Sequence, residues 1–77
     1  MADVEETVRT MIEARKESVK YYEHQIEDLS EYYKGEPRAL LRGTKFAVGQ
    51  IETFEAEIDL LNSVLIAAGL AYNGEEV

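Results

Sequence analysis

The chain has 77 residues, no cysteine, and 16 acidic against 8 basic side chains, which give a formal net charge of −8. A chain of this length forms one small domain with a marginal hydrophobic core, and the lack of cysteine excludes disulfides and thiolate zinc sites. The negative charge disfavours contact with phosphate backbones and anionic lipid, so we expect no direct binding to nucleic acid or to a membrane.

The N-terminal sequence MADVEETV carries acids where a secretory signal would carry bases followed by an apolar segment. The longest apolar-rich run, from Leu60 to Ala71, contains Asn62 and Ser63. It is shorter than the roughly 18 residues that a membrane-spanning helix needs. The expected location is the cytoplasm.

The first predicted element is a helix over residues 3–33. Asp3 is a suitable N-cap, and Glu5 and Glu6 fall in the opening turn, where the helix dipole favours negative charge. Beyond them, seam residues recur at alternating spacings of four and three without proline or glycine, which is the heptad pattern of a coiled coil. The seam consists of Val8, Ile12, Arg15, Val19, Tyr22, Ile26, Leu29 and Tyr33.

A turn is expected at residues 34–36, because Gly35 and Pro37 are typical stop and start signals for helices. The second helix is expected over residues 37–72, followed by a loose tail at 73–77. Its seam keeps the same alternating spacing throughout, at Leu40, Thr44, Ala47, Ile51, Phe54, Ile58, Leu61, Leu65, Ala68 and Tyr72.

Two glycines, Gly43 and Gly49, interrupt the second helical segment without shifting its seam, so we favour one continuous helix. The alternative is a short helix at 37–42 and a new helix capped by Thr44. Two helices of similar length with a short connection predict an all-α, antiparallel, coiled-coil-like hairpin. Folding the chain at the turn sets Tyr22 opposite Gly49, a large ring facing a gap.

The last third of the second helix is apolar on all sides, which is more than one neighbouring helix can cover. Two hairpins packed into a four-helix bundle would bury the surplus. A homodimer is therefore the expected assembly, with higher oligomers as the alternative. The predicted interface consists of Val4, Val8, Met11, Leu60, Leu61, Val64, Leu65 and Ala68.

Arg15 places a charge on the seam of the first helix, where it needs a partner or a route to water. Across the hairpin it falls near Glu55, Glu57 and Asp59, so an ion pair that fixes the helix register is the first interpretation. The alternative is an arginine that binds an anionic ligand or an acidic residue of a partner.

Basic residues gather around the predicted turn, and aromatic rings lie close to them. Bases mixed with aromatic rings can bind nucleotides by charge and stacking, although a solvated loop has the same composition. We define the basic tip as Lys34, Arg38, Arg42 and Lys45. Tyr21 and Tyr32 lie outside the seam and are candidate contact residues, since exposed tyrosines are favoured at interfaces.

No catalytic motif is present. His24 is the only histidine, and the heptad phase places it opposite the seam, among acidic residues. We interpret it as a solvated side chain, because the inward Glu-x-x-His pairs of di-iron helical bundles are absent. We expect no enzymatic activity, no metal site and no cofactor.

These patterns favour a non-catalytic protein-binding module, a small acidic hairpin that binds itself and regulates, bridges or inhibits an unidentified protein partner. One alternative is an oligomer that binds a small anion or nucleotide through Arg15 or the basic tip. A second is an acidic mimic of nucleic acid, of the kind that viruses encode, that blocks a nucleic-acid-binding enzyme.

Overall fold

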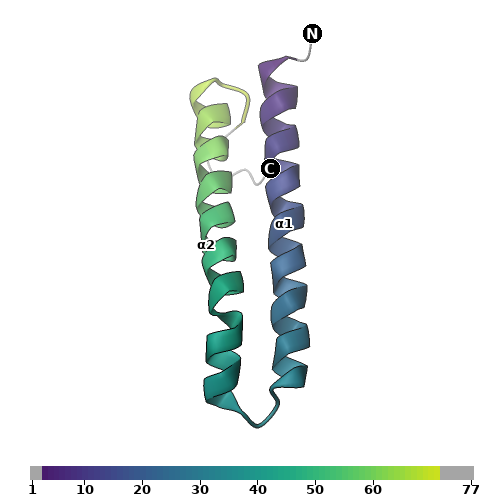
Figure 1. The fold of residues 1–77 in the computed structure, drawn as a ribbon. Helices are drawn as coiled ribbons and strands as arrows, with labels where there is room; N and C mark the ends of the chain where they lie inside the picture. The colour runs from purple at the N-terminus through teal and green to yellow at the C-terminus, as the bar shows by residue number, and fades with distance from the viewer. Residues whose placement is uncertain (1–2, 72–77) are drawn as a thin grey trace.

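The computed structural model describes residues 3–71 and confirms the all-α hairpin. Helix α1, Val4–Tyr32, and helix α2, Pro37–Ala67, lie side by side and antiparallel (Figure 1). The molecule measures 49 × 24 × 15 Å, so its shortest dimension is one helix thick. Neither broad face of the hairpin is covered by a further element of the described chain.

The ends of α1 follow the expected capping chemistry. The Glu6 N–H donates to the Asp3 carboxylate at 3.0 Å, which confirms the predicted N-cap. At the other end the Tyr33 N–H donates to the Leu29 carbonyl at 2.8 Å. The chain then reverses through Gly35, whose φ of 85° lies in the left-handed region that favours glycine.

Helix α2 starts at Pro37 and runs without a break through Gly43 and Gly49. The alternative of two separate helices is therefore wrong. Thr44 does not cap a new helix, because its hydroxyl donates to the Leu40 carbonyl one turn earlier, at 2.9 Å.

The end of α2 differs from the expectation, since the helix stops at Ala67 rather than near residue 72. Gly69 has a φ of 74°. Its N–H donates to the Ile66 carbonyl at 3.0 Å, and the Leu70 N–H donates to the Leu65 carbonyl at 2.9 Å. These two bonds form a Schellman C-cap. Tyr72 and the tail at 73–77 lie outside the described residues.

The hydrophobic core is small and sits at the open end of the hairpin. Ile12 and Leu65 have no exposed surface, and Val8 is 8% exposed beside them. Ile58, Leu61 and Ala71 pack against this cluster and are partly buried. The turn after α2 thus returns the chain to the core and closes it.

Arg9 holds that turn against α1. Its guanidinium donates to the Leu70 carbonyl at 3.0 Å and to the Glu5 carboxylate at 3.1 Å. A cation is favourable near the C-terminal end of a helix, where carbonyl groups lack intrahelical partners.

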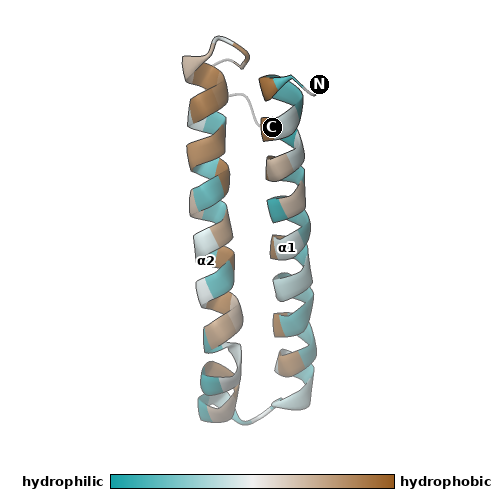
Figure 2. Cartoon of the chain, turned by 45° about the horizontal axis from the view of Figure 1, so that its top comes forward, coloured by the Kyte–Doolittle hydropathy of each residue, from teal (hydrophilic) through white to brown (hydrophobic). Residues whose placement is uncertain are grey.

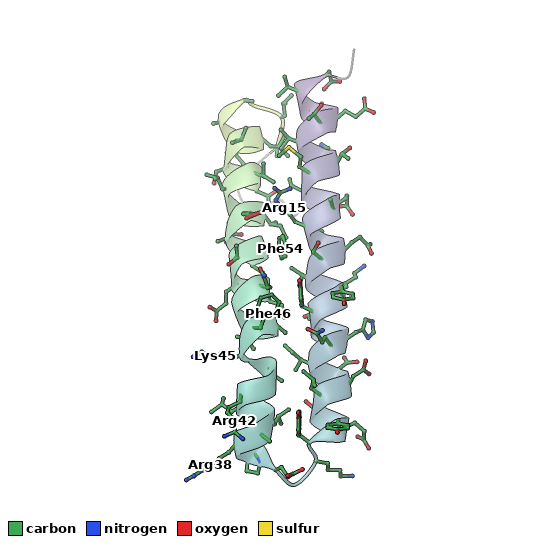
Figure 3. The ribbon with its side chains drawn as sticks, viewed as in Figure 1. Arg15, Arg38, Arg42, Lys45, Phe46 and Phe54 are labelled. Carbon is green, nitrogen blue, oxygen red and sulfur yellow. The ribbon has the colours of Figure 1, made fainter. Side chains whose placement is uncertain are left out.

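Aromatic rings fill the middle of the hairpin. The Tyr22 ring lies near both Phe46 and Phe54, with centroids 6.1 and 6.3 Å away (Figure 3 labels both phenylalanines). The expected pairing of Tyr22 with Gly49 is wrong, because a Cβ at Gly49 would meet no atom within 4 Å. The large-on-small contact occurs nearer the turn, where a Cβ at Gly43 would lie 3.1 Å from a Tyr33 ring carbon.

Gly49→Ala is expected to raise the free energy of unfolding by up to about 1 kcal/mol, because alanine favours the helix and its methyl group meets open space. Gly43→Ala is expected to gain less, since the Tyr33 ring must move aside. Urea denaturation followed by circular dichroism, at the same low protein concentration for both variants, measures the difference. Equal effects would contradict the Tyr33 contact.

Candidate protein-interaction surface

The eight residues predicted to form an oligomer interface divide into exposed and buried sets. Val4 is 70%, Leu60 67%, Val64 43% and Met11 38% exposed. Ala68 is also exposed, and Leu61 is half-buried. Large apolar side chains in water at this density are available to pack against another chain.

Val8 and Leu65 correct the prediction, because both lie in the hairpin's own core. Leu65 is fully buried and Val8 nearly so, which leaves them almost no surface for a second chain. The physical reason is the closing turn after α2, which brings Ala71 against the same cluster. A helix continued to residue 72 would have left that end open.

One broad face of the hairpin is marked by contacts between the two helices. Arg15 of α1 bonds to Glu57 of α2, and Tyr22 of α1 contacts Phe46 of α2. Residues one or more turns away from Arg15 and Glu57 share their face, because helical neighbours repeat at spacings of three and four. We call this the uncharged face, consisting of Val4, Thr7, Met11, Ser18 and Gln25 on α1 and Phe46, Gln50, Thr53, Leu60 and Val64 on α2.

Charge is nearly absent from the uncharged face. None of its ten residues is ionisable, and the charged residues set among them, Arg15 and Glu57, neutralise each other. Exposed apolar side chains lie along it from the open end to Phe46, which is 65% exposed. Figure 2 shows the hydrophobic residues concentrated in the C-terminal half of α2 and the hydrophilic ones on the outer side of α1.

The opposite face carries the charges. Lys16, Lys20 and Glu23 of α1 and Glu55 of α2 line one shallow hollow, together with Val19 and Ile58. Acidic and basic side chains alternate there, so this face is a mixed, solvated surface. The two sides of a single hairpin therefore differ sharply in their capacity to pack against another chain.

The Arg15–Glu57 contact confirms the ion-pair interpretation. The Arg15 Nε lies 2.8 Å from the Glu57 carboxylate, and its Nη1 donates to the Met11 carbonyl at 3.1 Å. The two side chains are 27% and 40% exposed. Figure 3 shows Arg15 between the helices. The guanidinium is thus engaged within its own chain, and the pair links α1 to α2 in register.

A double-mutant cycle with Arg15→Ala and Glu57→Ala is expected to give a coupling free energy of about 1 kcal/mol, reduced by added salt. The exposed pair Lys20–Glu17, whose charged atoms are 3.9 Å apart, serves as the control and is expected to give almost none. Equal coupling in the two cycles would show that the Arg15–Glu57 contact has no special role in joining the helices.

The basic tip is exposed, as expected for residues around the turn. Arg38, Arg42 and Lys45 point away from α1 (Figure 3). Within residues 3–71 none of the tip side chains, Lys34 included, forms an ion pair. Arg38 and Arg42 line an open, shallow hollow beside Pro37.

The two candidate contact tyrosines lie on the surface. Tyr21 is 63% and Tyr32 77% exposed. Each packs edge-on against its neighbour on the seam, with centroid distances of 5.1 Å to Tyr22 and 4.8 Å to Tyr33. Their hydroxyl-bearing rings therefore have a neighbouring ring on one side and remain open to water.

His24 lies on the polar side, as predicted, with its side chain 77% exposed and its Nδ1 3.4 Å from the Glu27 carboxylate. Residues 3–71 contain no cluster of three or more side chains suited to hold a metal ion. Neither of the described helices is long and apolar enough to cross a membrane.

Sequence reasoning missed the polar members of the uncharged face, Thr7, Ser18, Gln25, Gln50 and Thr53. They belong to neither seam, and no motif marks them. The usable signal is the position of the charges around α1, because every charged residue from Glu5 to Glu31 except Arg15 and Asp28 falls on the other side of the helix.

Comparisons with protein-family models, curated proteins and solved structures found no match for this chain.

Proposed function

We propose that this chain is a non-catalytic protein-binding module that self-associates through its uncharged face, forms a four-helix bundle with a second copy, and regulates, bridges or inhibits a partner protein in the cytoplasm. One observation carries the proposal: one face of a hairpin one helix thick has exposed apolar side chains and almost no charge, whereas its other face carries mixed charges. Single exposed apolar residues are ordinary, but a whole face of them next to uncharged polar residues is typical of an interface.

The size of the core supports the same conclusion. Among residues 3–71 only four apolar side chains are buried, Val8, Ile12, Ala47 and Leu65. A two-helix domain with so small a core is marginally stable alone, and oligomerisation is a common remedy. A second hairpin on the uncharged face would cover exposed apolar side chains such as Phe46 and Leu60 and add a second layer of helices.

The face left outside such a bundle is the one with mixed charges, with the basic tip at one end. Charged, solvated surfaces of this kind give specificity and steer association more than they add affinity. We therefore assign the contact with a partner protein to this outer face and to the exposed rings of Tyr21 and Tyr32.

Sedimentation equilibrium of the full chain, over a range of concentrations, tests the proposal. The expected result is a reversible shift from the 8.7 kDa chain to a species of twice that mass. Thermal unfolding should then occur at higher temperature as concentration rises, because assembly stabilises the folded state by mass action. A single 8.7 kDa species at every concentration would overturn the proposal.

A further inference from the structure

We propose that the second copy packs antiparallel along α2, and that a row of four charged residues on the outer side of α2, next to the uncharged face, sets this orientation. The inference rests on the self-association proposed above and adds its geometry. The row consists of Arg38, Lys45, Glu52 and Asp59.

The row has a regular spacing and an ordered sequence of charges. Its members are seven residues apart, so they occupy one heptad position and lie along one line of α2. Two bases are followed by two acids. All four side chains are exposed, and none forms an ion pair within residues 3–71.

The row borders an uncharged seam. Lys45, Glu52 and Asp59 each directly precede a residue of the uncharged face, in turn Phe46, Thr53 and Leu60. Gly49 and Ala56 lie between Phe46, Thr53 and Leu60 along α2 and are also exposed. These five residues, at alternating spacings of three and four, form the uncharged seam. The seam and its charged edge have the arrangement of a coiled-coil contact, in which charged flanking positions choose partner and direction.

In an antiparallel helix pair, the same flanking position of each helix faces its counterpart across the seam. Along one chain the order of the row is base, base, acid, acid, and the antiparallel second copy presents it in reverse, so each base faces an acid. Arg38 faces Asp59 of the second copy, and Lys45 faces Glu52 of the second copy, because both pairs have the same midpoint, between Val48 and Gly49. The two-fold symmetry repeats each pair, so four ion pairs form.

Near the same midpoint a large side chain lies close to a gap. Phe46, 65% exposed, falls at the height of Ile51 of the second copy, about 3 Å along the helix axis from Gly49. Within one hairpin nothing requires glycine there, because a Cβ at Gly49 would meet no atom within 4 Å. An interior glycine lowers helix stability by about 1 kcal/mol relative to alanine. Packing of the Phe46 ring of a second copy near this position would explain why a glycine stands there.

The register also places the turn of the second copy beside Leu60. The tip of the second hairpin thus covers Leu60. Arg42 is the one charged residue on the overlapping seam, and its long side chain is exposed and reaches water past its apolar stem.

A parallel pairing gives the opposite result. Each row residue would then face the flanking residue five positions later on the other helix. Glu52 would meet Glu57, and Lys45 would meet the uncharged Gln50. Both basic tips would also lie together. With a net charge of −8 on each chain, repulsion between copies favours the arrangement that pairs bases with acids.

Charge exchange on the row tests the orientation. Lys45→Glu and Glu52→Lys are each expected to weaken self-association about tenfold at low salt, because each variant sets like charges opposite each other twice in the dimer. The double variant K45E/E52K is expected to restore the wild-type dissociation constant, since it reverses each pair and leaves the net charge unchanged. Lys20→Glu on the opposite face is the matched control for K45E and is expected to change the constant little.

The cysteine-free chain also allows a direct distance measurement. Single variants Val48→Cys and Ser63→Cys, each spin-labelled, place one reporter near the midpoint and one far from it. In the antiparallel dimer the labels at 63 are separated by about 45 Å along the helix axis, at 1.5 Å per residue, whereas those at 48 lie at nearly the same height. In a parallel dimer the two variants give similar short separations.

The outcomes separate the two proposals. A chain that sediments as a monomer at all concentrations overturns self-association itself. A dimer in which K45E/E52K stays as weak as the single variants, or in which the labels at 63 lie close together, overturns the antiparallel inference alone. Restored affinity together with a long separation at 63 supports it.

Discussion

Leu65→Ala is expected to lower the free energy of unfolding by about 3 kcal/mol, which removes most of the stability of so small a domain. Leu65 is fully buried against Ile12 and Val8. The alanine leaves a cavity in addition to the lost transfer free energy. The cluster offers few other buried side chains that could move into that space. The chain is therefore expected to be largely unfolded at 25 °C and low concentration.

Thermal and urea denaturation, followed by far-ultraviolet circular dichroism, measure this effect. Leu41→Ala is the matched control, because it makes the same chemical change in the same helix at a side chain that is 73% exposed. Its effect is expected to stay within about 0.5 kcal/mol. Similar losses for the two variants would show that Leu65 is not the centre of the core.

Local signals explain why the main elements could be predicted from the sequence. The Asp3 cap, the turn at Gly35 and Pro37, and the heptad spacing each depend on a few neighbouring residues. Arg15 could be matched to Glu57 because a short turn leaves little freedom in the register of two long helices. The structure has this ion pair at 2.8 Å.

The end of α2 could not be predicted from spacing alone, because the helix continues through two of its glycines and ends just before a third. At Gly43 and Gly49 the seam on either side packs against α1, with Thr44 and Ala47 buried, and packing outweighs the cost of glycine. At Gly69 no such support is available. The hairpin register sets Val4, the first residue of α1, at about the height of Ala68, so a longer α2 would extend past its partner.

The assignment of core and interface needed three dimensions for a similar reason. Val8 and Leu65 lie on the two seams, and Leu60 and Val64 do not, but heptad phase alone does not say whether the chain's own closing turn covers the end of the seams. The turn from Gly69 to Ala71, held by Arg9, buries the first two and leaves Leu60 and Val64 in water. Only the exposed pair therefore belongs to the proposed interface.

Leu60→Glu combined with Val64→Glu is expected to weaken self-association by about a hundredfold or more, because each copy would replace apolar side chains of the contact with carboxylates that must lose water. The hairpin itself should remain helical, since the wild-type side chains are 67% and 43% exposed and contribute little to the core. Two like charges one turn apart destabilise a helix by only about 0.2–0.5 kcal/mol. Sedimentation equilibrium measures the dissociation constant, and circular dichroism checks that the helices persist.

The chain contains a close control for this variant. Leu41 and Val48 are the same residue types in the same helix, with exposures of 73% and 42%, but they lie outside the uncharged face. Leu41→Glu with Val48→Glu adds the same charge and is expected to leave most of the self-association intact.

If both double variants dissociate equally, added charge rather than a particular surface is responsible. If Leu60→Glu with Val64→Glu still dimerises with wild-type affinity, the copies meet elsewhere. Dissociation of the first variant alone would locate the contact on the side of α2 that carries Leu60 and Val64, because both variants add the same charge to the same helix.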